Sequence, residues 1–159
     1  MTELTEVREV PRPIEEVFAY IADFSTTAEY DPGIVSAHRK GPVGKDAQFH
    51  VEARFMGQTL PMAYTCTLYE SPTRLEFRGE SSGSKAHDRI VLQAIDGGTQ
   101  IRWNLQLELT GTSRWLEVFL RPALRRMGRK ALDGLTQRLH DRGFLHQLGA
   151  TQLWKDPEN

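Results

Sequence analysis

The sequence of 159 residues predicts an α+β fold, in which a curved antiparallel sheet of about seven strands wraps around a long C-terminal helix. Two observations support this prediction. Residues 34–109 form a succession of segments in which apolar and polar side chains alternate between turn sequences. After Leu109 the apolar residues recur at helical spacing, up to about Gly143. A sheet with one apolar face must cover that face, and this helix is long enough to do so.

The N-terminal part predicts one strand and two short helices. Residues 4–10 alternate as a strand does, and Pro11 and Pro13 end it. Residues 14–24 then place apolar side chains at helical spacing directly after Pro13, a residue that suits a first helical turn. The stretch STTAEYDPG, residues 25–33, begins with capping residues and ends at Pro-Gly, which predicts a second short helix or a turn.

Six further strands are predicted, and the clearest is GTQIRWNLQLEL. Its apolar residues Ile101, Trp103, Leu105, Leu107 and Leu109 all fall on one face. We expect this face to pack against the terminal helix, with Trp103 beside an open space. Gly57–Gln58, SPT, SSGS and DGG separate the strands as turns. The six predicted segments are residues 34–41, 47–57, 60–70, 74–80, 85–95 and 98–109.

The terminal helix carries an apolar stripe on one face. Thr112 or Ser113 can cap it, and Pro122 predicts either a kink or a break between a short and a long helix. The domain is predicted to span residues 1–143, followed by a C-terminal tail over residues 144–159. The stripe consists of Leu116, Leu120, Leu124, Met127, Ala131, Leu135 and Leu139.

Composition excludes several classes of function. The net charge of −1 provides no overall basic field for nucleic acid. The single cysteine, Cys66, excludes an internal disulfide and a multi-cysteine metal site, and the five histidines lack metal-ligand spacing, so we expect no metal and no cofactor. The sequence has no apolar run long enough to cross a membrane and no secretory signal, which predicts a cytoplasmic location. Whether the chain forms a homodimer is left open.

Inward-facing side chains predict an apolar cavity between sheet and helix, in which a few polar atoms such as the Tyr64 hydroxyl and the Trp103 N–H could orient a ligand. An ordinary packed core is the alternative. The candidate ligand-binding residues are Tyr30, Phe49, Val51, Phe55, Met62, Tyr64, Cys66, Phe77, Trp103, Leu105, Leu120, Leu124 and Met127.

Asp88 is the unusual residue of this set, because it shares the inward parity of Ile90 and Leu92. A buried carboxylate is costly unless it is paired or protonated, which makes Asp88 a candidate general acid or base. Two alternatives remain: Asp88 lies at the open end of its strand, or a bulge turns it outward and brings Arg89 inside. The candidate catalytic residues are therefore Asp88, Tyr64 and Arg89.

The chain resembles the Bet v 1-like, or START-like (SRPBCC), superfamily, close to its polyketide cyclase/dehydrase branch. The resemblance covers roughly residues 3–142. It implies a helix-grip fold, with a cavity for a lipid, sterol, polyketide or other apolar molecule, and relatives that either carry ligands or catalyse cyclisation or dehydration. It is carried by VPRPIEEVFAYIADFSTTAEYDPGI, DGGTQIRWNLQLEL and RPALRRMGRKALDGLTQRL.

Binding of an apolar small molecule, such as a lipid or polyketide, is the leading hypothesis for function, because the inward set is mostly apolar and holds no assembled catalytic group. The first alternative is a polyketide cyclase or dehydratase that uses the polar residues of the cavity. The second is a protein-interaction module that uses the basic face of the terminal helix. That face carries Arg121, Arg125, Arg126, Arg129 and Lys130.

Overall fold

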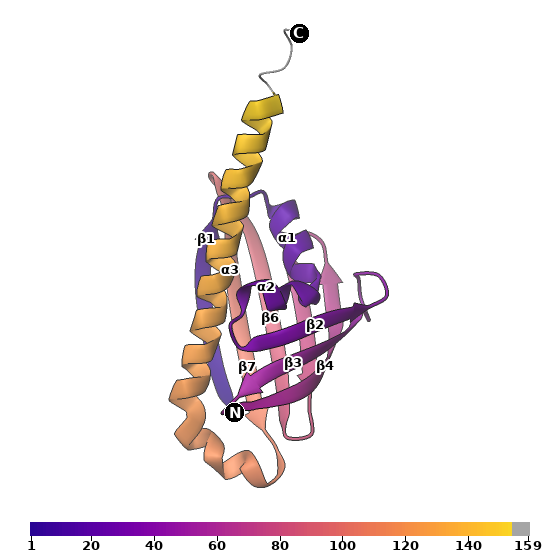
Figure 1. The fold of residues 1–159 in the computed structure, drawn as a ribbon, viewed down its shortest axis with the longest axis vertical. Helices are drawn as coiled ribbons and strands as arrows, with labels where there is room; N and C mark the ends of the chain where they lie inside the picture. Colours follow the sequence, from indigo (N-terminus) through magenta and orange to yellow (C-terminus); the bar gives the residue numbers. More distant parts are fainter. Residues whose placement is uncertain (154–159) are drawn as a thin grey trace.

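Seven antiparallel strands form one sheet in the order β1-β7-β6-β5-β4-β3-β2, and a long helix lies on its concave side (Figure 1). This computed structural model describes residues 1–153, with side chains described except at residues 112–113 and 142–153. The architecture confirms the predicted fold. Its elements are β1 (Thr2–Val10), α1 (Ile14–Ala22), η1 (Phe24–Thr26), α2 (Thr27–Tyr30), β2 (Ile34–Lys40), β3 (Gln48–Phe55), β4 (Gln58–Glu70), β5 (Arg74–Glu80), β6 (Ser84–Ile95), β7 (Gly98–Leu109), η2 (Gly111–Leu116) and α3 (Glu117–Leu153).

The register of the sheet determines which side chains face the helix. β6 and β7 pair without interruption, so that Asp88 lies opposite Leu105 and Ile90 opposite Trp103. Register shifts occur in β2 and in β4, next to Cys66. Such irregularities bend a strand and increase its twist, which helps the sheet to curve around the helix.

The helix α3 packs chiefly on β1 and also touches α2 (Figure 1). Two glycines permit this close approach. A Cβ atom at Gly134 would lie 2.0 Å from the carbonyl oxygen of Tyr30, and one at Gly128 would lie 2.6 Å from Leu4 Cδ2. Bare helix backbone therefore rests on α2 and β1, and these contacts set the distance between α3 and the rest of the sheet.

The ends of α3 differ from the sequence-based expectation. The helix was expected to end near Gly143, but it continues to Leu153, and Figure 1 shows its last turns extending beyond the sheet. Pro122 lies inside one continuous helix. The first turns nevertheless run at an angle to the rest (Figure 1), as expected where a proline removes a helical hydrogen bond. Residues 154–159 of the predicted tail lie outside the described residues, and the division at residue 143 stays a prediction.

Candidate functional site

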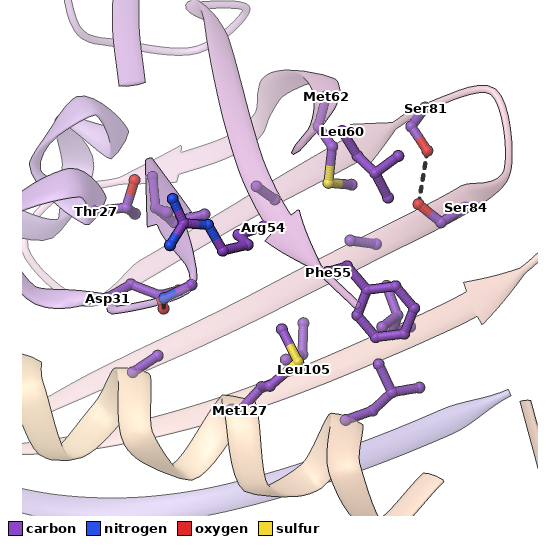
Figure 2. Close-up of a pocket in the computed structure, with 18 of the residues that line it drawn as sticks. Thr27, Asp31, Arg54, Phe55, Leu60, Met62, Ser81, Ser84, Leu105 and Met127 are labelled. Carbon is purple, nitrogen blue, oxygen red and sulfur yellow. Dashed lines mark hydrogen bonds between the residues drawn. The ribbon is translucent and has the colours of Figure 1, made fainter. Parts of the chain in front are cut away.

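A cavity of about 520 Å³ lies between the sheet and α3, a size typical of small-molecule binding sites. Figure 2 shows Phe55 from β3, Leu105 from β7 and Met127 from α3 around the same space. Nine of the thirteen predicted ligand-binding residues line it: Tyr30, Phe55, Met62, Tyr64, Trp103, Leu105, Leu120, Leu124 and Met127.

The strand β7 and the helix α3 face each other across this cavity. Direct packing between them was expected at Leu107 and Leu109. Both side chains line the cavity together with Trp103 and Leu105, and at this end of β7 the N–H of Leu109 donates to Glu117 of α3. α3 rests chiefly on β1, through Gly128, and on α2, through Gly134, and it makes fewer contacts with β7. The open space beside Trp103 is confirmed.

The cavity has a buried end and an exposed mouth. Tyr30, Tyr64, Asp88 and Trp103 line it and are all buried. At the other extreme, Met56 in the turn between β3 and β4 lines the cavity and is exposed, as is Leu116 in η2. A ligand that enters past Met56 and Leu116 would meet Asp88 and the two tyrosine hydroxyls at the buried end, while Arg54 and Gln58 are exposed residues of the lining.

Asp88 points into the cavity, as its parity with Ile90 predicted. Its carboxylate Oδ1 accepts a hydrogen bond of 2.7 Å from Trp103 Nε1. Burial, together with the nearby charge of Asp31, raises the pKa of Asp88 to about 7, against the lowering effect of the bond from Trp103. A carboxyl group with a pKa near neutral pH is well suited to act as a general acid or base.

Arg89 does not belong to the site. It is exposed on the outer face of the sheet, because β6 pairs with β7 without the bulge that would have turned it inward. The candidate catalytic role for Arg89 is therefore wrong.

Two tyrosine hydroxyls lie near Asp88. Among the described residues, the buried Tyr30 hydroxyl has no hydrogen-bond partner, and that of Tyr64 has a weak contact of 4.0 Å to Met62 Sδ. Burial, reinforced by the charges of Asp31 and Asp88, raises the pKa of both phenols well above 10. Both hydroxyls therefore stay protonated and can donate a hydrogen bond to a ligand. Tyr30, which the sequence predicted in a short helix or turn, lies at the buried end of the cavity.

Asp31 is a site residue that sequence reasoning missed. Its carboxylate lines the cavity and accepts a hydrogen bond of 2.8 Å from the backbone N–H of Gly33. Burial raises its pKa to about 6, although the Gly33 bond lowers it. The motif Asp-Pro-Gly predicted a turn, but a turn pattern does not by itself indicate that the Asp31 carboxylate lines a cavity.

Four predicted ligand-binding residues belong to the packed core instead: Phe49, Val51, Cys66 and Phe77 are fully buried and do not line the cavity. For Phe49 and Phe77 the reason is Phe24, which was not among the predicted site residues. Its ring lies 4.5 Å from the ring of Phe77 and 5.9 Å from that of Phe49, and it lines the cavity itself. η1 thus inserts an aromatic side chain between the cavity and this part of the sheet.

The described residues contain no group of three or more His, Cys, Asp or Glu side chains that could hold a metal ion. Within the same part of the chain, none of the helices combines the length and hydropathy needed to cross a bilayer.

A model of the family described as polyketide cyclase/dehydrase and lipid transport matches residues 1–140. Three solved structures with the same fold illustrate the similarity. TTHA0849 from Thermus thermophilus has a TM-score of 0.74 at 20% identity, over 86% of this chain and 96% of that one. The Zhui aromatase/cyclase from Streptomyces sp. R1128 has a TM-score of 0.71 at 12% identity, over 88% and 94%. A START superfamily protein from Mycobacterium smegmatis has a TM-score of 0.68 at 15% identity, over 93% and 99%. No curated protein matches the sequence significantly.

Proposed function

Because the chain belongs to the polyketide cyclase/dehydrase and lipid transport family, we propose that it binds an apolar small molecule, such as a lipid or a polyketide, in the cavity under α3. The observation that supports this most directly is the cavity of about 520 Å³, whose lining is mostly aliphatic and aromatic and ends in a few polar groups. Apolar walls provide affinity, and a small number of polar groups fix the orientation of a ligand.

The polar groups favour a particular kind of ligand. The Tyr30 and Tyr64 hydroxyls are donors, and Asp88 accepts when ionised and donates when protonated. A hydroxyl or carbonyl group at the leading end of an apolar molecule would bond to them. A carboxylate there would be repelled by ionised Asp88 and Asp31. We therefore propose a neutral oxygen function at the buried end.

The proposal that the cavity binds a ligand can be tested by filling the cavity with a larger side chain. Ala131 lines the cavity on α3, whereas Ala123 is exposed on the same helix. We expect Ala131→Trp to abolish the binding of a fluorescent fatty alcohol, and to remove any ligand seen by native mass spectrometry of the purified protein. Ala123→Trp is the matched control and should behave as the wild type. Equal probe binding by both variants would refute the proposal.

Catalysis by a cyclase or dehydratase mechanism is a second candidate, favoured by one observation: Asp88, with a pKa of about 7, shares a cavity with two protonated tyrosines. A carboxyl group that titrates near neutrality can move a proton to or from a β-keto substrate while a phenol donates to the developing enolate oxygen. Asp88→Asn should then abolish turnover of a poly-β-keto thioester with little change in its binding. Retained turnover would exclude this role.

A protein-interaction function for the basic face of α3 loses part of its support. Arg129 pairs with Glu6 of β1 at 3.1 Å, and Arg125 donates to the backbone carbonyl of Glu3. These two side chains help to attach α3 to the sheet, so they are not simply free to contact a partner.

A further inference from the structure

Large apolar side chains are exposed where α3 begins. Trp115 in η2 is 68% exposed, Phe119 in the first turns of α3 is 76% exposed, and Val118 between them is also exposed. Met56, in the turn between β3 and β4, is 73% exposed. Together with Leu116 we call these residues the mouth patch. Large aromatic side chains are rarely this exposed on a protein surface, and a group of them marks a site of interaction.

The mouth patch surrounds the entrance of the cavity. Met56 and Leu116 line the cavity while belonging to the patch, and Leu120, one turn further along α3, continues the lining inward. Figure 1 shows the start of α3 and the turn between β3 and β4 at the same end of the molecule. Whatever covers the patch therefore also covers the mouth.

Positive charge accompanies this apolar surface. Residues 111–130 contain six basic residues, Arg114, Arg121, Arg125, Arg126, Arg129 and Lys130, and one acidic residue, Glu117. Glu117 is buried and accepts hydrogen bonds from the Thr2 hydroxyl and the Leu109 N–H. Its charge is therefore directed inward, whereas Arg114, Arg126 and Lys130 are exposed. Residues 111–130 therefore expose positive charge beside the mouth patch, although the whole chain has a net charge of −1.

We propose that the mouth patch docks the protein on an anionic lipid bilayer, with the cavity mouth facing the membrane. Tryptophan and phenylalanine side chains insert at the boundary between headgroups and acyl chains, and neighbouring arginines bind anionic headgroups. A second copy of the chain fits this surface less well, because a symmetric contact would bring the same arginines of both copies together. Docking of this kind would let an apolar ligand pass between bilayer and cavity without crossing water.

Vesicle flotation tests the proposal with two pairs of matched variants. The wild type should float with vesicles of phosphatidylcholine and phosphatidylserine, and much less with phosphatidylcholine alone. Trp115→Ser combined with Phe119→Ser, and Arg114→Glu combined with Arg126→Glu, should each weaken binding about tenfold or more. The controls are Val35→Ser with Val91→Ser, and Arg78→Glu with Arg102→Glu, which change exposed residues elsewhere on the sheet and should leave flotation unchanged.

Docking on vesicles can be tested separately from ligand binding in the cavity. Ala131→Trp, which fills the cavity, should float as the wild type does, so failure of docking and failure of ligand binding can be told apart. Failure of the wild type to float with anionic vesicles would overturn the proposal, as would flotation of the patch variants at the wild-type level. A wild-type dimer in analytical ultracentrifugation that the Trp115 and Phe119 substitutions convert to monomer would assign the patch to a second copy instead.

Discussion

Replacing Asp88 by asparagine should make the stability of the protein less dependent on pH. The pKa of this buried carboxyl lies at about 7 in the folded chain, against an ordinary value of 3.8. An acid with a raised pKa binds its proton more tightly in the folded state, so the free energy of unfolding falls as pH rises from about 4 to about 7 and is then constant. Each pKa unit corresponds to about 1.4 kcal/mol, so this one residue costs roughly 4 kcal/mol at about pH 8.

Asp88→Asn removes this cost, because an amide is neutral at every pH and its oxygen can still accept the bond from Trp103 Nε1. We therefore expect the variant and the wild type to have similar stability near about pH 4, and the variant to be more stable by up to about 4 kcal/mol near about pH 8. Urea denaturation followed by circular dichroism at a series of pH values measures the difference. The pKa of Asp31 is also raised. In the variant, the free energy of unfolding should therefore still fall with pH between about pH 4 and 6, but by less than in the wild type.

The matched control is Asp96→Asn, which changes an exposed aspartate in the turn between β6 and β7. It should shift the stability curve equally at all pH values or not at all. The reasoning would be refuted if the wild type and Asp88→Asn had parallel stability curves over this range. That outcome would mean that the folded chain stabilises the ionised Asp88 carboxylate as well as water does.

Four further predictions follow from particular contacts. Gly134→Ala should lower the free energy of unfolding by about 1–3 kcal/mol despite the better helix propensity of alanine, because the new Cβ would meet the Tyr30 carbonyl. Urea denaturation measures this change. Gly83→Ala, where a Cβ meets no other atom, is the control and should have little effect. Tyr30→Phe should leave the ligand-free protein as stable as the wild type or more so, since it removes a buried hydroxyl without a partner among the described residues. The same substitution should weaken the binding of a fatty alcohol measured by calorimetry. Stronger binding would contradict the proposed orientation of the ligand. In the wild type the hydrogen bond from Trp103 lowers the pKa of Asp88. Trp103→Phe removes this bond, so the pH dependence of stability attributed to Asp88 should extend to higher pH. An unshifted profile would show that the bond does not act on Asp88. The Cys66 thiol, whose pKa burial raises to about 11, should react slowly with iodoacetamide at about pH 8 until urea unfolds the chain; fast reaction in the folded chain would be the contrary result.

Periodicity along the chain was sufficient to predict the seven strands, the terminal helix and the inward faces of the strands. Alternation in residues 98–109 identified a strand with Trp103 on its inner face, and the parity of Asp88 with Ile90 indicated a carboxyl group that points inward. Side-chain direction in a strand depends on neighbouring residues alone, which is why these predictions needed no knowledge of the fold. The same local information could not distinguish an inward residue that faces a cavity from one that faces the core.

That distinction depends on contacts between residues far apart in the sequence. Phe24, placed by η1, covers Phe49 and Phe77 and takes them out of the cavity, and no pattern near either phenylalanine could indicate this. The close approach of Gly134 in α3 to the Tyr30 carbonyl is likewise a contact between residues far apart in the sequence.

The sequence by itself therefore determined the strands, the terminal helix and the face on which each side chain lies, because these follow from backbone geometry over a few residues. Only the tertiary structure decided where the apolar faces touch and where they leave a space. A cavity is the volume that remains when elements rest on one another at a few close contacts, here bare glycine backbone of α3 on α2 and β1. The exposed mouth patch has a related origin, because the first turns of α3 leave its apolar residues without a surface that buries them.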